Sequence, residues 1–570
     1  MERRSDSRLE LGSIENFWQD REMENRPQWK ERLLLLVLAL AVAFPFLGSF
    51  GLLEPDEGRF AQIGREMAAS GDFLVPRLNG IEQFYKPPLV YWISAVGMRL
   101  FGVSEWTARL PSALAFVGII WLVGWMGWRV GGRKVGWMAA LILASMVEPY
   151  ALGRQITLDM SLTFWVTAAM ACLVEVGLDG RGRGWGYLFF FCMGMGFLAK
   201  GPMAWVVPLS AAWMWGWSDK RSGKKLTLPW KSGMALTFGV ALSWFVLVCL
   251  EYPELWKYFL GYELVERFAS TTHGRSKPWW FFLPILVIGT VPWTGFLLGL
   301  GAAGWRKLKD RSMTSMQWGL AGAVIIPFVV VSCSGSKLLT YILPIYPALA
   351  LALAMGLSRG LGGVWEKLGW GMALTLLSLL GPGLWSVRHF WSEAEVAVPS
   401  AMYLGGATGL SVLLIFAWWI KVRKGDVLLK VSWVAGVALL FWHGASGEME
   451  RINDLLGRQA SVRSLARLVE KRMPARLFIY RARASGLIFT LDRKVWINRR
   501  DADVVVESTE EAKGRLFERP DELRRGLGAG ERVEGITLRE IFREEFNATQ
   551  WEILGRAGEF YLVRSWGLGN

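Results

Sequence analysis

The sequence predicts a polytopic α-helical membrane protein with about thirteen spanning helices, followed by a C-terminal soluble α/β domain. Two observations support this fold class. The chain has 570 residues, of which 53% are hydrophobic and 20% charged, with 33 tryptophans and a mean hydropathy of +0.30. Apolar runs near the ~20 residues needed to cross a bilayer recur from about Leu33 to Leu440. This composition excludes a soluble enzyme, a secreted disulfide scaffold and a disordered chain.

The expected spans divide the chain into three parts. Residues 1–32 form a cytoplasmic N-terminal segment, residues 33–445 the membrane domain and residues 446–570 the soluble domain. Short loops rich in Lys and Arg follow alternate spans, which the positive-inside rule assigns to the cytoplasm, so an odd span count places the C-terminal domain outside. The spans are expected at about 33–53, 106–127, 135–152, 160–178, 185–199, 202–217, 232–250, 279–301, 317–333, 341–358, 366–387, 402–420 and 427–445.

The C-terminal part has a different pattern from the rest of the chain. From about Glu448 no apolar run of spanning length remains, and short β-like pieces mix with a helical stretch at 459–471. This part is nearly charge-balanced, so the net charge of +15 lies mainly in the loops between spans, and we expect no nucleic-acid partner. The β-like pieces are 477–480, 495–497, 504–506 and 560–563.

Two long insertions, about 54–105 and 251–278, are expected on the extracytoplasmic face. From Asp56 to Met67 the apolar residues follow helical spacing. A second apolar stretch, Leu89–Phe101, covers only about 20 Å as a helix, which is too short for the ~30 Å hydrocarbon core. We expect both to lie along the outer membrane surface as helices, above a cavity in the bundle.

Two adjacent acids, Asp56 and Glu57, follow the first span directly. An unpaired carboxylate near hydrocarbon costs several kcal/mol. The pair is therefore either a solvated cap at the membrane interface or a carboxylate held there as a catalytic base or substrate-positioning group.

Lysines form a second group of candidates. Lys86 lies between Tyr85 and two prolines, which place its ammonium on a stiff, non-helical segment. A fixed cation at headgroup level suits a phosphate or diphosphate, and the alternative is a lysine that snorkels beside an aromatic residue. Lys200 interrupts a long apolar stretch, either as an incidental lysine in a tight hairpin or as a second phosphate-binding cation.

Other polar residues lie at the extracytoplasmic ends of later spans. Arg154 and Asp159 flank the start of the fourth span, where a salt bridge explains them as well as a site does. Lys337 is another lysine at the extracytoplasmic end of an expected span. Tyr341 lies near it and can donate a hydrogen bond. The second insertion contains His273, which taken alone is more often structural than metal-ligating.

All these residues fall on the same predicted face. Several cations and two acids beneath an apolar roof fit an anionic lipid headgroup, because acids activate an acceptor while cations stabilise a departing phosphate. This arrangement suits glycosyl transfer from a lipid phosphate sugar. A Gly-rich loop followed by Lys-Ser/Thr does not occur in the sequence, so ATP-driven transport has no support.

The same residues carry a resemblance to a known family. The chain resembles the aminoarabinose transferase-like glycosyltransferases, which belong with the protein mannosyltransferases to the GT-C class of polyprenyl-phosphate-sugar-dependent enzymes. The similarity extends from about residue 33 to 360. The segments that carry it are Pro55–Ala61, Arg65–Met67, Gly71–Phe73, Leu78–Gly80, Lys86–Leu89, Phe101–Val103, Ala108–Ser112, Arg154 with Asp159, Gly196–Pro202 and Lys337 with Tyr341–Pro344.

This resemblance implies a GT-C fold, a sugar donor linked to undecaprenyl or a similar phosphate, and an active site on the outer face. Asp56 would be the main acid that activates or positions the acceptor, and Asp159 a second acid. The candidate site then comprises the catalytic residues Asp56, Glu57 and Asp159, the phosphate-binding residues Lys86, Lys200, Arg275 and Lys337, and the cavity-lining residues Arg59, Tyr85, Arg154, His273 and Tyr341.

One position departs from the family pattern. The residue before the Lys-Pro-Pro run is typically Glu, which with a loop His can hold a divalent metal, but here it is Tyr85. His273 remains as the one metal candidate, and a phenol is a poor zinc ligand at neutral pH. The sequence therefore argues against a divalent metal cofactor at this position and against aminoarabinose as the sugar.

Three functions remain open. The first is transfer of a sugar from polyprenyl phosphate to a lipid or glycan acceptor at the outer face of a bacterial inner membrane. The second is protein O-mannosyl transfer, with a protein acceptor. The third is a flippase for lipid-linked sugars, although transporters usually place polar residues near the bilayer midplane on broken helices. In each case the partners include membrane lipids.

Overall fold

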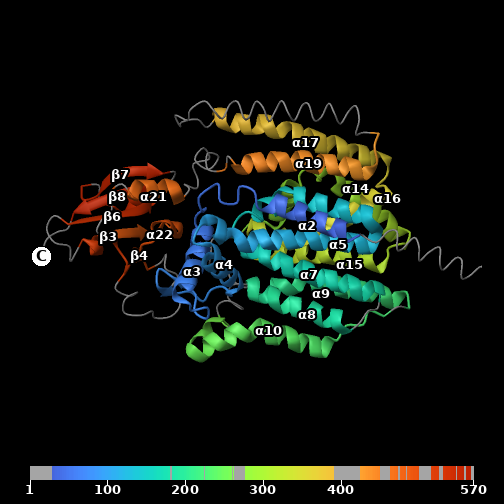
Figure 1. Ribbon diagram of the computed structural model, residues 1–570, viewed down its shortest axis with the longest axis horizontal. Coiled ribbons are helices and arrows are strands. Elements are labelled where there is room, and N and C mark those ends of the chain that lie inside the picture. Colours follow the sequence, from blue (N-terminus) through green and yellow to red (C-terminus); the bar gives the residue numbers. More distant parts are fainter. Residues whose placement is uncertain are drawn as a thin grey trace, which may run out of the picture.

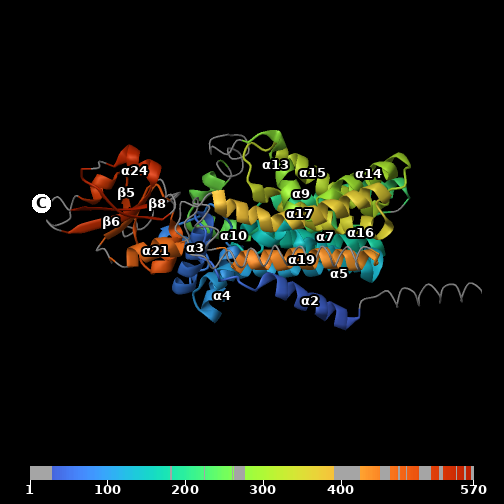
Figure 2. The same cartoon turned by 90° about the horizontal axis from the view of Figure 1, so that it is seen from above.

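The computed structural model places a bundle of long helices beside a smaller α/β unit, which lies at one end of the bundle in Figure 1 and in the perpendicular view of Figure 2. Between the two units lie α3 and α4. The structure describes residues 28–566 apart from 180–182, 224, 260, 262–276, 391–423, 448, 450–461, 471, 473–475, 483, 500–514, 525–530, 547–548 and 558–559.

The bundle consists mainly of helices with apolar residues on all sides. Within the described ranges, six helical segments are long and apolar enough to cross a membrane. The predicted polytopic helical fold class is confirmed, whereas the count of thirteen spans stays a prediction because span 402–420 lies outside the described residues. The helices are α2 (Trp29–Ala43), α5 (Glu105–Ser145), α6 (Val147–Leu152), α7 (Leu158–Asp179), α8 (Arg183–Lys200), α9 (Met203–Arg221), α10 (Trp230–Glu251), α13 (Phe282–Gly289), α14 (Gly295–Lys309), α15 (Ser315–Cys333), α16 (Tyr346–Arg359), α17 (Gly363–Phe390) and α19 (Val427–Gly447).

Helix α5 is a hairpin that contains the expected span 106–127 and the first part of the expected span 135–152, whose end forms α6. The chain turns at Gly132, whose φ of 75° lies in the region that favours glycine. The two arms approach closely, because a Cβ atom on Gly127 would lie 2.6 Å from the Cα of Gly136. Basic residues of the turn pair with acids of other segments, namely Arg129 with Glu175, Arg133 with Glu31 and Lys134 with Asp426.

The expected span over 279–301 is not one helix. Helix α13 ends at Gly289 and α14 begins at Gly295, with Pro292, which has no N–H to donate, between them. The Thr290 hydroxyl donates to the carbonyl of Leu286 (2.8 Å) and the Thr294 hydroxyl to that of Val287 (2.6 Å). The Leu286 carbonyl also accepts the backbone N–H of Thr290, whereas the Thr294 hydroxyl supplies Val287 with a donor at the break in the helix.

Helices α3 (Asp56–Ser70) and α4 (Leu89–Phe101) form a layer at one end of the bundle, joined by a hairpin of β1 (Arg77–Leu78) and β2 (Ile81–Glu82). Both helices lie where the periodicity of the sequence predicts them. Their apolar faces share one core, which includes Phe60, Ile63, Met67, Val90, Tyr91 and Ala95.

The C-terminal unit is built on a six-stranded sheet with the order β5-β4-β3-β6-β8-β7. Strands β5, β4, β3 and β6 are parallel, and β8 and β7 are antiparallel additions. Helix α21 (Val462–Glu470) and α22 (Ser485–Leu491) share one apolar core with the sheet, and α24 (Arg539–Glu545) belongs to a second, aromatic-rich core. The strands are β3 (Arg476–Tyr480), β4 (Trp496–Asn498), β5 (Leu516–Phe517), β6 (Arg532–Leu538), β7 (Glu552–Ala557) and β8 (Phe560–Trp566).

The sequence patterns identified half of these strands. The pieces 477–480, 495–497 and 560–563 correspond to β3, β4 and β8, while 504–506 lies outside the described residues. Strand β6 was missed because Glu534 and Gly535 interrupt its apolar pattern, although Glu534 is buried in the sheet. The α/β class of the C-terminal part is nevertheless as predicted.

Candidate active site

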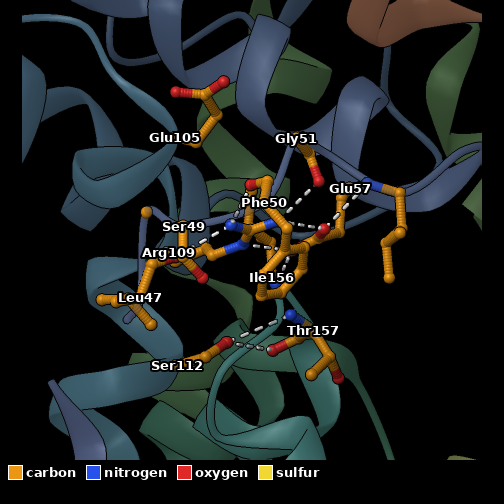
Figure 3. A network of polar contacts seen from close by, with 12 residues as sticks. Leu47, Ser49, Phe50, Gly51, Glu57, Glu105, Arg109, Ser112, Ile156 and Thr157 are labelled. Carbon is orange, nitrogen blue, oxygen red and sulfur yellow. Dashed lines mark hydrogen bonds and ion pairs between the residues drawn. The ribbon is translucent and has the colours of Figure 1, made fainter. Parts of the chain in front are cut away.

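Glu57, the second residue of α3, is buried in an ion pair with Arg109 of α5 (Figure 3). Arg109 donates from Nε to Glu57 Oε1 (2.9 Å) and from Nη2 to Oε2 (2.8 Å). The backbone N–H groups of Leu53 and Ile156 donate to the same carboxylate at 2.9 and 2.8 Å. Because the carboxylate is saturated inside the protein, this geometry favours a positioning role for Glu57 over the catalytic role expected from the sequence.

Arg109 also holds the segment between α2 and α3. Its remaining N–H groups donate to the carbonyls of Leu47 (2.8 Å), Phe50 (2.9 Å) and Gly51 (3.0 Å). Burial of a charge is tolerated only when it is paired and hydrogen-bonded, and both conditions are met here. The chain that leads into Asp56 is therefore fixed from within the bundle.

Asp56 begins α3 and stays accessible, with 56% of its side chain exposed. Arg59, one turn later, donates from Nη2 to Asp56 Oδ1 at 2.6 Å. The Arg59 guanidinium also lies 4.7 Å from the centroid of the Tyr85 ring, in the loop that leads into α4. Three residues predicted to belong to the site are thus in contact, and Asp56 presents an oriented carboxylate.

Asp159 is buried at the start of α7. Lys200, the last residue of α8, donates to Oδ1, and the hydroxyl of Thr340 donates to Oδ2 at 2.9 Å. Lys200 Nζ lies 4.5 Å from the centroid of the Tyr341 ring. Three elements, α7, α8 and the 3₁₀ segment η3 (Leu339–Ile345), therefore bring together Asp159, Lys200 and Tyr341, which the sequence placed on one face.

The two acidic segments are linked to each other through Glu57. Its carboxylate accepts the N–H of Ile156, three residues before Asp159, while Glu57 itself follows Asp56 directly. Thr157 continues this connection, because its hydroxyl accepts the N–H of Asp159 at 2.9 Å. One ion pair thus sets the position of both candidate acids.

Arg154 does not pair with Asp159, so the salt bridge considered from the sequence is not formed. Its Nη1 donates instead to the carbonyls of Val42 and Ala43, at 3.1 Å each. Arg154 is buried and ties the end of α2 to the α6–α7 connection.

The remaining lysines differ in their surroundings. Lys337 is buried, and its Nζ donates to the carbonyls of Ser334 (2.5 Å) and Lys277 (3.1 Å). The side chain thus joins two backbone segments. Lys86 is half-buried in the loop before α4. Two other candidates, His273 and Arg275, lie outside the described residues.

Sequence reasoning missed three residues of this region. Arg109 carried a signal, since a charged residue inside an expected span needs a partner. For Thr340 the sequence contained no sign of a role in the site except that the residue precedes Tyr341. Glu54 was also missed: it is buried, and burial raises the pKa of its carboxyl well above the ordinary range.

The described residues around Tyr85, which do not include His273, do not form a site for a divalent metal. Among the described residues, no three His, Cys, Asp or Glu side chains gather closely enough to hold a metal ion. The ring of Tyr85 is already covered by the Arg59 guanidinium, whose positive charge disfavours a second cation there.

Comparison with known proteins agrees with this architecture. Residues 29–259 match the family described as dolichyl-phosphate-mannose-protein mannosyltransferase. The undecaprenyl phosphate-α-4-amino-4-deoxy-L-arabinose arabinosyl transferase of Edwardsiella ictaluri is 35% identical over 339 residues, which are 57% of this chain and 58% of that protein. The enzyme of the same name from Pectobacterium atrosepticum is 30% identical over 468 residues, which are 77% of this chain and 80% of that protein.

Several of these matches, including that to the Edwardsiella protein, span less than two thirds of the relative's length. The crystal structure of ArnT from Cupriavidus metallidurans bound to undecaprenyl phosphate has a TM-score of 0.75 at 23% identity, and the match covers 93% of this chain and 97% of that one. This likeness confirms the predicted GT-C fold with its C-terminal α/β part.

Proposed function

Because the chain belongs to the family of aminoarabinose transferase-like glycosyltransferases, we propose that it moves a sugar from a polyprenyl phosphate to a lipid or glycan acceptor. One structural observation carries the proposal. The pair between the buried Asp159 and the half-buried Lys200 is linked through Glu57 to the accessible Asp56 of α3. Acceptor activation requires an accessible acid, and phosphate departure requires a fixed cation.

The transfer forms one bond and breaks one. The hydroxyl oxygen of the acceptor attacks the anomeric carbon of the sugar and forms the new glycosidic bond. The bond from that carbon to the phosphate oxygen breaks and releases polyprenyl phosphate. The hydroxyl proton passes to the carboxylate of Asp56, which Arg59 holds in orientation.

Lys200 stabilises the negative charge that grows on the departing phosphate. Its ammonium is held between the Asp159 carboxylate and the Tyr341 ring, so little reorganisation is needed during the reaction. Asp159 orients Lys200 in this scheme, with help from Thr340. The family resemblance assigns Lys86 and Arg275 to the same phosphate.

The end of the bundle that carries α3 faces the outside of a bacterial inner membrane in this proposal. Basic residues of the α5 turn support it, because Arg133 pairs with Glu31 at the start of α2, away from α3. Such basic turns are typical of the cytoplasmic side.

The sugar is the open part of the proposal. The relatives' names specify 4-amino-4-deoxy-L-arabinose. Tyr85, covered by Arg59, changes the site in this chain and favours a different sugar. A protein acceptor is the rival that the mannosyltransferase family match suggests.

Transfer in proteoliposomes tests the proposal. Purified protein is given undecaprenyl phosphate carrying radiolabelled aminoarabinose, mannose, glucose or galactose, with lipid A, a glycan or a peptide as acceptor. We expect one donor to support transfer, and Asp56→Asn to reduce the rate by about 10²-fold or more. Glu552→Gln is the matched control, since that exposed acid lies on a strand of the C-terminal sheet and pairs with Arg564.

Each negative result has a separate meaning. Labelled lipid that crosses the bilayer without transfer, unaffected by Asp56→Asn, indicates a flippase and contradicts the proposal. Transfer to the peptide alone indicates a protein glycosyltransferase. Transfer with Asp56→Asn at the wild-type rate removes Asp56 from the reaction.

A further inference from the structure

The C-terminal unit contacts α3 directly, at the end where the candidate acids lie. Gly58 of α3 packs against Gly486 of α22 so closely that a Cβ atom on Gly58 would lie 2.3 Å from the Gly486 nitrogen and 2.6 Å from its Cα. Real Cβ atoms essentially never come this close to backbone, so the backbones of the two units are in contact.

Glu54 forms the polar part of this contact. The residue is only 4% exposed, and its Oε1 accepts the N–H of Gly486 at 2.5 Å. The other carboxyl oxygen has no hydrogen-bond partner among the described residues. Burial of a carboxyl group with a single hydrogen-bond partner costs free energy of folding. Packing alone therefore does not explain the presence of this group beside Asp56.

Gly486 lies in α22, which follows strand β3 of the sheet. Strand β3 lies between β4 and β6, and the chain passes from β3 to β4 on one side and returns to β6 on the other. In open α/β sheets the segments after the strands that flank such a reversal are the usual ligand-binding position. Here the segment after β3 contacts Glu54 of the chain's own transferase part.

Other contacts secure the same interface farther along α3. Arg65 pairs with Asp492 at 2.5 Å and donates to the carbonyl of Phe489. Asn79, in the β1–β2 hairpin, exchanges two hydrogen bonds with the backbone of Val495 at 2.8 and 3.1 Å. These contacts dock the unit, whereas the contacts of Glu54 and Gly58 with Gly486 lie two residues from the candidate acid Asp56.

We propose that Glu54 is a positioning residue through which the C-terminal domain holds the start of α3, and with it Asp56, in the orientation that transfer requires. This inference rests on the proposed function. The Arg109–Glu57 pair fixes α3 from the bundle side, and Glu54 fixes it from the side of the C-terminal domain. The burial that raises the pKa of Glu54 favours the neutral acid, so an amide is a suitable replacement.

Three variants test the proposal. Glu54→Gln keeps an oxygen that accepts the Gly486 N–H, Glu54→Ala removes it, and Gly58→Ala forces α3 and α22 apart. Hydrogen exchange of peptides covering 54–70 and 484–491 reports on the contact without any substrate. Peptides covering 532–538 and 560–566 report on the remainder of the sheet, and Glu552→Gln is again the matched control.

Glu54→Ala and Gly58→Ala are expected to speed exchange in the first two peptides only. A misplacement of about 1 Å lowers rates by up to about 100-fold, so kcat should fall while the KM for the donor changes less than about threefold. Glu54→Gln should restore kcat to within about threefold of wild type. If Glu54→Ala does not fold, Glu54→Gln and Gly58→Ala decide the question.

Specific results would overturn the proposal. Normal kcat in Glu54→Ala together with faster exchange shows that the contact does not position the reaction. Reduced kcat with unchanged exchange shows that Glu54 acts on the substrate directly. If the wild-type protein transfers no sugar, the proposed function fails, while the exchange data still report on whether Glu54 holds the two units together.

Discussion

Glu57 and Arg109, 52 residues apart in the sequence, form a buried ion pair in which every N–H group of the guanidinium has an acceptor. A buried pair of this kind gives weak net stabilisation but a large penalty when one partner is removed. Its consequence here is geometric, since the carboxylate also accepts the N–H of Ile156. The pair therefore sets the distance between the two segments that carry Asp56 and Asp159.

Arg109→Lys should destabilise the protein strongly. A lysine keeps the charge but presents three donors in place of the planar set of five, so carbonyls of the 47–51 segment lose their partners. We expect a loss of about 3–5 kcal/mol, measured as thermal unfolding in detergent. Arg133→Lys is the control, because its more exposed pair with Glu31 should be worth about 0–1 kcal/mol. Equal effects of the two substitutions would contradict the structural role of Arg109.

Neighbouring acids should behave differently when neutralised. Asp56→Asn should reduce transfer by about 10²-fold or more with an unchanged melting temperature, because its side chain is largely exposed. Glu57→Gln should lower the melting temperature, since it leaves Arg109 without its counter-charge. Thermal unfolding and transfer rates measured on the same samples separate the two roles. A stable but inactive Glu57→Gln protein would return Glu57 to the catalytic role predicted from the sequence.

Thr340→Val should slow transfer without unfolding the protein. The hydroxyl donates to Asp159 Oδ2, and a hydrogen bond to a charged group is worth about 1.5–3 kcal/mol. That energy corresponds to a rate reduction of about 10- to 100-fold if Asp159 orients Lys200 in the transition state. Thr375→Val is the matched control, since that exposed hydroxyl donates to the carbonyl of Gly371 within its own helix, α17. A Thr340→Val rate equal to that of the control would show that Asp159 needs no such support.

The contact between Glu54 and Gly486 should weaken as pH rises. Burial raises the pKa of Glu54 in the folded protein and outweighs the Gly486 N–H and the Arg59 charge, which lower it, while the carboxylates of Asp56 and Glu57 raise it further. A raised folded pKa means that the stabilisation is complete below the unfolded pKa of about 4.3 and is lost as pH rises through the folded value. Exchange in the 484–491 peptide, corrected for intrinsic rates, should therefore be faster at pH 8 than at pH 5. Glu54→Gln cannot ionise and should show no such change, and an identical pH response would assign the effect to another group.

Local patterns predicted the helices of the site correctly. The spacing between Asp56 and Met67 and the stretch Leu89–Phe101 correspond to α3 and α4, because a half-buried helix shows its period in the sequence. Alternation of loops between the two membrane faces was enough to place Asp159, Lys200 and Tyr341 together. These predictions needed no knowledge of tertiary contacts.

The sequence could not predict in the same way which group each charged side chain contacts. Lys337 and Arg154 look like cavity cations in the sequence, yet both donate to backbone carbonyls in segments distant from them. In the sequence, Glu57 is as plausible a catalytic acid as Asp56. Only the fold shows that the Glu57 carboxylate is buried in an ion pair with Arg109. Which of several charged residues stays accessible depends on the packing of distant segments, and local periodicity carries no information about that.

The contact between Glu54 and Gly486 also sets an order in time. The two residues are 432 positions apart, and Gly486 leaves the ribosome long after α3 has been made. At about 5–20 residues per second, that interval is about 20 to 90 seconds. During biosynthesis α3 is held from the bundle side alone, so a stalled or truncated chain would insert its helices and still lack the second support for Asp56. Completion of the polypeptide thus becomes a condition for assembly of this end of the molecule.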